Sequence, residues 1–466
     1  MRGDGLAGTF HSWRDGTDER DEEHLGERSE TTLRLGSRLF VQNASGNVRE
    51  LKGLLYRRAL TSDYVDSDAF LREPERARYV ATQSIDERPA IGIEVRATGG
   101  EPETLWFGEN GLIVRVEYID GDGPTTVDMR DYRSVEGLLV AYTTVTSDGD
   151  TAFDIVETTT SVLVNKPVDP AHFAQLRPRV LLGSGVQTLP LEERGGHYYV
   201  RVTVNGKPYV FLVDTGAQSL LLDSHVAKEL AIPEEGSLEV RGTARGGGLH
   251  TVHIASLGVG NLHLDDIVAS SLDIGDSAAG ALRFDGILGY PFFATALVEL
   301  DFGKKTMRVG APGSFRPRGE LVPIELDRAI PEATLDVNGR YRAPFIIDTG
   351  SSSDVLLFRW FVDLHPGVVP FTAQQGLNYG LGGTTSAYRS SLDELTIGST
   401  PMYHRYTDVM LAKQGAFADR FDAGNVGLGV LRNFVLTLDE SSLALFFERA
   451  SDFDDGRSRK QFLTAR

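Results

Sequence analysis

The sequence predicts a mainly β protein, in which an antiparallel curved-sheet domain with a little helix precedes two homologous β-barrel lobes. Three observations support this fold class. Apolar residues recur mostly at every second position, turns containing Gly interrupt them at short intervals, and two long segments of the second half repeat one series of motifs. Alternation at period two is typical of strands, and an internal repeat indicates two copies of one structural unit.

Composition limits the partners that the chain can have. Its 466 residues carry 47 Lys and Arg against 66 Asp and Glu, which gives a net charge of -19. Nucleic acids and anionic membranes both attract positive potential, so we expect neither as the main partner. The chain has no cysteine, which excludes disulfides and cysteine nucleophiles. Its His residues lack metal-ligand spacing such as HExxH, so we expect no metal and no cofactor.

Residues 1–178 are predicted to form the antiparallel sheet. Short apolar runs flank Asn110-Gly111, and the same arrangement recurs around Asp148-Gly149. An Asn-Gly pair favours a type I′ hairpin turn, because both central residues of that turn have positive φ. Residues 60–83 are expected to cover the sheet as helix or loop.

The remaining boundaries follow from changes in composition. A stretch with several Pro and Gly and little periodicity contains the predicted linker, residues 179–187. The two lobes are predicted at residues 188–318 and 319–450. Residues 451–466 are polar and are expected to be a frayed tail.

The repeat is most evident around two Asp-Thr-Gly sequences. VFLVDTGAQSLLL occupies residues 210–222, and PFIIDTGSSSDVLL occupies residues 344–357. Each follows a strand pattern with an Asn-Gly turn and precedes a second apolar run. We expect each Asp to lie on a tight turn at the edge of a core, with the Gly permitting close approach of a neighbouring backbone.

Two further pairs of segments belong to the repeat. FDGILGYPFF begins at residue 284, and AGNVGLGVL begins at residue 423; each leads into a strand that ends in Leu-Asp. The Gly-rich hairpins predicted at residues 241–260 and 379–398 are candidates for flaps over a bound peptide, with ordinary surface hairpins as the alternative. Tyr379 and Tyr388 are possible aromatic contacts in the second hairpin.

The two Asp-Thr-Gly sequences suggest paired carboxyl chemistry. If the lobes pack about a pseudo-two-fold axis, the carboxyl groups of Asp214 and Asp348 come together. Two carboxylates that close cannot both ionise easily, so the pair is expected to share one proton. One group can then accept a proton from a water molecule, while the other polarises a carbonyl. A turn without chemistry is the alternative for a single copy.

Residues 188–450 resemble the aspartic peptidases, which carry an apolar residue followed by Asp-Thr-Gly and Ala or Ser. The short lobes and the Asp-Thr-Gly-Ala form at 214–217 resemble retropepsin-like bacterial aspartyl proteases more than pepsin. The resemblance implies that Asp214 and Asp348 are the catalytic pair. It implies reciprocal hydrogen bonds between the lobes from Thr215 and Thr349. It further implies that these residues support the active site: Gly216, Gly350 and Ser351.

The second copy departs from the family pattern downstream of its Asp. Where the first copy has Asp285-Gly286-Ile287-Leu288-Gly289, we align Asn425-Val426-Gly427-Leu428-Gly429. In this alignment Gly427 replaces a branched residue, and the second lobe is expected to be looser around its Asp turn.

The first domain has a weaker resemblance. Residues 1–178 resemble the curved-sheet fold of periplasmic lipoprotein carriers, on the basis of strand order and the closing sequence VETTTSVLVNKPVDPAHFAQ. This resemblance implies a possible lipid or lipoprotein partner and a bacterial periplasmic or secreted protein whose signal peptide is absent. The charged first residues lack a secretory signal, so a cytoplasmic location is the alternative.

The sequence thus predicts an aspartic endopeptidase that acts on peptides or proteins. Because both Asp turns lie in one chain, a monomer should suffice for catalysis. Two other functions remain open at this point: a non-catalytic peptide-binding protein that keeps the cleft, and a lipid or lipoprotein carrier in which the lobes are accessory.

Overall fold

The computed structural model describes residues 1–3, 5–120, 123–241, 245–274, 283–326, 328–371, 374–380, 383–413 and 415–458. The chain divides into two compact units. The first contains residues 1–43, 48–176 and 236–238, and the second contains residues 44–47, 177–235 and 239–466. The described residues include no helix that is long and apolar enough to cross a membrane.

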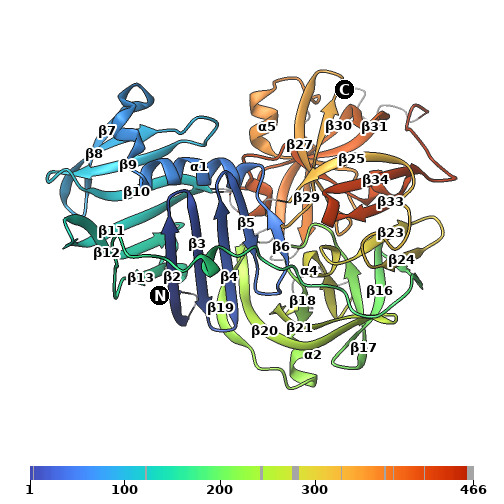
Figure 1. Cartoon of the computed structure of the whole chain (residues 1–466). Coiled ribbons are helices and arrows are strands. Elements are labelled where there is room, and N and C mark those ends of the chain that lie inside the picture. Colours follow the sequence, from blue (N-terminus) through green and yellow to red (C-terminus); the bar gives the residue numbers. More distant parts are fainter. Residues whose placement is uncertain are drawn as a thin grey trace. The chain divides into compact units, whose positions relative to one another are not determined.

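The first unit is built on one antiparallel sheet (Figure 1). Its strands lie in the order β6-β5-β4-β3-β2-β1-β13-β12-β11-β10-β9-β8-β7, so chain neighbours are mostly sheet neighbours. The strands are β1 (Arg2–Gly3), β2 (Leu6–Asp15), β3 (Asp18–Leu25), β4 (Arg28–Leu35), β5 (Arg38–Gln42), β6 (Val48–Glu50), β7 (Ala77–Ile85), β8 (Arg88–Val95), β9 (Glu103–Gly108), β10 (Ile113–Asp120), β11 (Gly123–Val135), β12 (Leu138–Ser147) and β13 (Ile155–Thr158).

The helix α1 (Leu54–Asp66) shows that this sheet is curved. One part of α1, with Leu55 and Tyr56, packs on Leu39 and Val41 of β5. Another part, with Val65, packs on residues of β8, β9 and β10, which lie at the other end of the strand order. A single helix can contact both ends only if the sheet bends around it. The prediction of an antiparallel curved sheet with a little helix is therefore confirmed.

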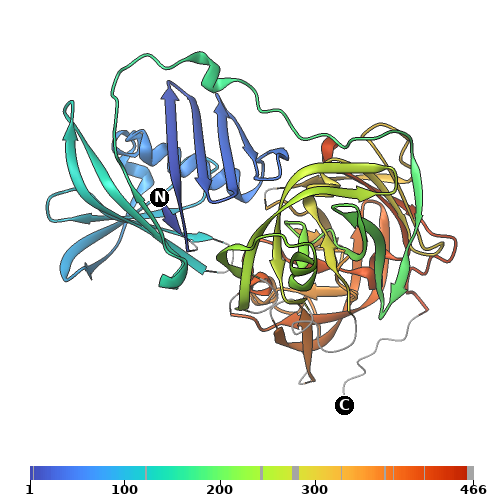
Figure 2. The same cartoon turned by 90° about the horizontal axis from the view of Figure 1, so that it is seen from below.

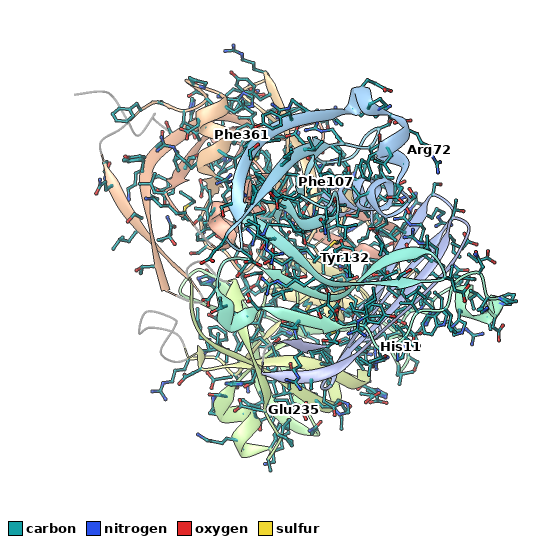
Figure 3. All side chains as sticks on the ribbon, turned by 90° about the vertical axis from the view of Figure 1, so that its left-hand side faces the viewer. His11, Arg72, Phe107, Tyr132, Glu235 and Phe361 are labelled. Carbon is teal, nitrogen blue, oxygen red and sulfur yellow. The ribbon has the colours of Figure 1, made fainter. Side chains whose placement is uncertain are left out.

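Aromatic side chains contribute to the core beneath α1. Phe107 of β9, labelled in Figure 3, lies with its ring centroid 6.4 Å from that of Phe70. Phe70 belongs to the short 3-10 helix Ala69–Arg72, which follows α1. Such aromatic pairs contribute packing beyond the area that they bury.

Two local predictions in this unit were inaccurate. Residues 60–83 are not all cover, because α1 begins earlier, at Leu54, and β7 occupies Ala77–Ile85. A hairpin does join β9 and β10, but only Gly111 of its Asn-Gly pair has positive φ. The turn is longer than a two-residue I′ turn, since Gly108 accepts a bond from Gly111 and donates one to Leu112.

The second unit contains two closed rings of strands (Figure 2). In the first lobe, the order β16-β17-β22-β18-β21-β20 closes through a β16–β20 pairing. In the second lobe, β26-β27-β32-β28-β31-β30 closes through β26–β30. The strands of this unit are β14 (Gln187–Pro190), β15 (Glu192–Arg194), β16 (His197–Val204), β17 (Lys207–Val213), β18 (Leu221–Asp223), β19 (Glu235–Arg241), β20 (Arg245–Val259), β21 (Leu262–Leu272), β22 (Gly286–Leu288), β23 (Leu297–Asp301), β24 (Thr306–Gly310), β25 (Glu320–Glu325), β26 (Glu332–Val337), β27 (Tyr341–Ile347), β28 (Val355–Leu357), β29 (Gln375–Gly380), β30 (Gly383–Ile397), β31 (Thr400–Met410), β32 (Gly424–Val426), β33 (Phe434–Asp439) and β34 (Ala444–Arg449).

The lobes are joined by a shared sheet and a shared core. Strand β23 of the first pairs antiparallel with β33 of the second, with Val298 opposite Leu438 and Asp301 opposite Val435. One continuous apolar cluster runs through both lobes. Among the described residues of this unit, short α-helices occupy Ser224–Glu229 (α2), Tyr290–Phe293 (α4), Arg359–Leu364 (α5) and Leu428–Leu431 (α6).

Candidate active site

The first Asp-Thr-Gly loop follows strand β17 directly. Its first backbone N–H, at Asp214, donates to the carbonyl of Leu288 in the parallel strand β22, at 3.2 Å. The Asp214 carboxyl then accepts a hydrogen bond from the N–H of Gly216 at 2.8 Å. Because the strand fixes the backbone and the turn fixes the side chain, Asp214 has a defined orientation.

The second loop repeats this arrangement after β27. Asp348 donates its N–H to Val426 of the parallel strand β32 at 3.0 Å. Its Oδ1 accepts hydrogen bonds from the N–H groups of Gly350, at 2.7 Å, and Ser351, at 3.0 Å. Strands that are far apart in the sequence thus present two Asp side chains on matching turns.

Hydrogen bonds between two threonines connect the loops. Thr215 N–H donates to Thr349 Oγ1 at 3.1 Å, and Thr349 N–H donates to Thr215 Oγ1 at 3.0 Å. Each hydroxyl in turn donates to a carbonyl of the other lobe: Thr215 to Ile347 at 2.5 Å and Thr349 to Val213 at 2.9 Å. Both threonines are buried, so these bonds are shielded from competing water.

The glycines allow the two carboxyl groups to approach each other. A Cβ atom on Gly350 would lie 2.2 Å from Asp214 Cγ, and one on Gly216 would lie 2.8 Å from Asp348 Cγ. Neither position can therefore carry a side chain without displacing the opposite Asp. The two Asp side chains are both partly buried, and each lies against the Gly of the opposite Asp-Thr-Gly loop.

The electrostatics of this pair favour a shared proton. Burial, followed by the charge of Asp348, raises the pKa of Asp214 well above its usual range. Backbone N–H groups of Gly216 and Gly350 act in the opposite direction but are smaller effects. A carboxyl group with a raised pKa keeps its proton to higher pH than usual, so Asp214 can serve as a proton donor.

The strand register corrects the sequence alignment of the two copies. In the first lobe Leu212 lies opposite Ile287, and in the second Ile346 lies opposite Asn425. Gly427 therefore corresponds to Gly289 and does not replace a branched residue. A Cβ on either glycine would collide with backbone carbonyls of its Asp loop, at 2.3 Å for Gly289 and 2.4 Å for Gly427. The expectation of a looser second lobe rested on an alignment that was wrong by two residues.

The departure from the family pattern is instead at Asn425. This side chain is 5% exposed and donates from Nδ2 to Asp348 Oδ2 at 2.5 Å. Its counterpart, Ile287, packs in an apolar cluster with Leu212 and Leu221. The sequence showed a polar residue within an apolar motif, but the wrong register concealed its position beside Asp348.

A second residue near the pair was not identified from the sequence. His197, the first residue of β16, lies close enough to Asp348 for its charge to act on the imidazole. Burial lowers the pKa of His197, and the Asp348 carboxylate partly offsets this effect. No short motif contains both residues, because packing of one lobe on the other brings them together.

The predicted flap in the second lobe is a hairpin. Strand β29 pairs with the first part of β30, with Gln375 opposite Tyr388 and Gly380 opposite Gly383. The ring of Tyr388 lies 6.2 Å from that of Phe371, which is 88% exposed. The side chain of Tyr379 lies outside the described residues, as do residues 242–244 within the predicted hairpin of the first lobe.

Within the described ranges, no three or more Asp, Glu or His side chains gather as ligands for a metal ion.

Comparison with known proteins finds a similarity for part of this unit. Residues 200–292 match the family model described as aspartyl protease. This part of the chain is thus similar to the aspartyl protease family. The matched range contains Asp214 and the complete strand β22, and Asp348 lies beyond it.

Two other comparisons add little. No curated protein matches the chain. A retropepsin-like aspartic protease from Rickettsia conorii, known from a crystal structure, is similar at 19% identity and a TM-score of 0.22. The match covers 29% of this chain and 96% of that one. The similarity of residues 200–292 to the aspartyl proteases therefore rests on the family model.

Proposed function

We propose that the chain is an aspartic endopeptidase in which Asp214 and Asp348 act together on one peptide bond. The observation that supports this proposal is the pairing of the two loops: Thr215 and Thr349 exchange hydrogen bonds, and Gly350 of one loop lies against the Asp214 carboxyl of the other. The aspartyl protease match over residues 200–292 supports the same reaction class. The matching strand rings further suggest that the lobes arose by duplication.

The reaction needs only water and the shared proton. The ionised carboxylate accepts a proton from a water molecule, whose oxygen then forms a bond to the peptide carbonyl carbon. The protonated carboxyl donates to the carbonyl oxygen, and a tetrahedral intermediate results. Cleavage of the C–N bond sends a proton to the leaving nitrogen and yields a new carboxyl group and a new amine. The pair then returns to its original protonation state.

Cleavage of a broad peptide library from acidic to neutral pH tests this function. The wild type should produce new amino termini, whereas Asp214→Asn and Asp348→Asn should produce none while keeping the wild-type circular dichroism spectrum. Wild-type protein that binds peptides without cleaving any would contradict the enzyme and favour a non-catalytic peptide-binding protein.

A further inference from the structure

Asn425 breaks the symmetry between the two lobes at the carboxyl pair. It lies in the middle of β32, with Ile346 of β27 and Leu356 of β28 as its strand partners. The corresponding position in the first lobe, Ile287, lies between Leu212 and Leu221. A polar side chain thus occupies a buried place where the matching strand carries an apolar one.

The amide of Asn425 completes the hydrogen bonding of Asp348. Oδ1 of Asp348 accepts from the backbone at Gly350 and Ser351, and Oδ2 accepts from Asn425 Nδ2 at 2.5 Å. Both carboxylate oxygens therefore face N–H donors. Such an arrangement favours the ionised form, because each of these donors bonds most strongly to a negative oxygen.

The surroundings of Asp214 differ from those of Asp348. Its carboxyl has the backbone N–H groups of Gly216 and Gly350 as partners. At the place of the amide stands Ile287, which has no polar atom in its side chain. The N–H of Ala217 is directed to the backbone carbonyl of Asp214, at 3.4 Å, whereas the equivalent N–H of Ser351 is directed to a carboxylate. The stronger donor set is therefore in the second lobe.

We propose that Asn425 is a positioning residue that holds Asp348 ionised, so that Asp348 is the base and Asp214 carries the shared proton. This inference rests on the proposed peptidase function and adds which Asp is the base and which carries the proton. Asn425 does not contact the scissile bond in this account. It acts by keeping one carboxylate charged and oriented towards the water molecule that attacks.

Other groups near Asp348 also bear on its ionisation. Two ionisable groups that interact with it are Asp214, from the end of β17, and His197, from the start of β16. A negative Asp214 disfavours a negative Asp348, whereas a protonated His197 favours it. Asp354 lies on the same loop, and its Oδ2 accepts the backbone N–H of Tyr406 of β31. The effect of Asn425 on the ionisation of Asp348 must therefore persist when His197 is replaced.

The test is the pH dependence of kcat/KM for peptide cleavage by the full chain. Asn425→Ile installs the residue of the first lobe and removes the donor. The acidic limb, which reports ionisation of the base, should move upward by about one pH unit. Asn425→Asp keeps the size of the side chain but replaces the amide with a group that can carry negative charge. The acidic limb of this variant should therefore move to higher pH by at least as much as that of Asn425→Ile. The same shifts should appear in a His197→Gln background.

A matched control separates positioning from packing. Asn433 is another buried Asn of the second lobe, and its amide donates to the carbonyls of Gly429 and Val430. Asn433→Leu should lower stability and leave the acidic limb at its wild-type pH. An unchanged limb in an actively cleaving Asn425→Ile variant would overturn the inference while the peptidase function stands. Absence of cleavage by the wild type would instead refute the proposed function itself.

Titration of the carboxyl groups provides a readout without turnover. With 13C-labelled Asp, the carboxyl signal that disappears in Asp348→Asn identifies Asp348. We expect this signal to titrate at higher pH in Asn425→Ile than in the wild type. A lower or equal titration midpoint would contradict the role of the amide.

Discussion

Thr215 and Thr349 each accept a hydrogen bond from the other's backbone N–H, at 3.0 and 3.1 Å. Each hydroxyl then donates to the chain that precedes the opposite Asp. The separation of the two carboxyl groups is therefore set by these side chains as well as by the two strands. Loss of these hydrogen bonds should therefore lower both activity and stability.

Replacement of Thr215 by Val tests this connection. The variant keeps the shape but leaves buried N–H and carbonyl groups without partners, so we expect a loss of about 1–3 kcal/mol in the free energy of unfolding. Peptide cleavage should fall together with stability, as measured by urea unfolding and kcat/KM. Thr215→Ser, which keeps the hydroxyl, should restore most of both quantities. Equal losses in the Val and Ser variants would argue against the hydrogen bonds.

Gly350→Ala should disable the carboxyl pair without removing either Asp. The new Cβ would lie 2.2 Å from Asp214 Cγ, and this conflict must displace the carboxyl. We expect kcat/KM to fall by at least about 100-fold, since displacement of a reacting group by about 1 Å has effects of this size. Gly123→Ala is the control, because a Cβ there meets no atom within 4 Å. Full activity in Gly350→Ala would contradict the close approach of the loops.

Arg328 should be essential for the stability of the second lobe. It is largely buried and forms ion pairs with Glu332, Asp419 and Asp422. The Arg328→Met variant would leave three carboxyl groups together without their cation. We expect a loss of about 3–5 kcal/mol in the free energy of unfolding near neutral pH. The loss should shrink at acidic pH, where these groups can take up protons.

An exposed pair provides the control for Arg328. Arg359 and Asp363 lie in the same lobe, with side chains that are 49% and 56% exposed. Arg359→Met should therefore change the free energy of unfolding by less than about 1 kcal/mol. Similar losses in the two variants would show that burial of the Arg328 cluster is unimportant.

The first unit should lose stability as the pH rises past the pKa of Glu103. This side chain is 4% exposed, and burial raises its pKa from 4.5 to about 7. The folded state then binds more protons than the unfolded state between these values, so rising pH favours unfolding. Urea unfolding at pH 5 and pH 8 should differ by up to about 3 kcal/mol from this group. Glu103→Gln should reduce that difference between pH 5 and pH 8. An unchanged difference would contradict the predicted contribution of Glu103 to the pH dependence.

The fold class and the two Asp loops were readable from the sequence because strong local patterns encode them. Alternating apolar residues and the repeated Asp-Thr-Gly depend on neighbours in the chain. The register of β32 was not readable in the same way. Gly424, Gly427 and Gly429 permit two alignments with Gly286 and Gly289, and only the pairing of Asn425 with Ile346 distinguishes them.

One contact across the two lobes could not be predicted from sequence patterns. His197 approaches Asp348 through the packing of one lobe on the other, and no spacing along the chain records that approach. The envelope location and the lipid or lipoprotein partner suggested for residues 1–178 stay predictions. Extraction of the purified protein and mass spectrometry of any bound lipid would test the partner.

The central claim, that one ionised and one protonated carboxyl group act together, is tested most directly by the pH profile of kcat/KM for a cleaved peptide. Two essential groups in opposite protonation states predict a bell-shaped profile. The acidic limb would report ionisation of one Asp, and the alkaline limb would report loss of the shared proton, whose pKa is raised at Asp214. A profile that rises once and stays level to alkaline pH would contradict the account.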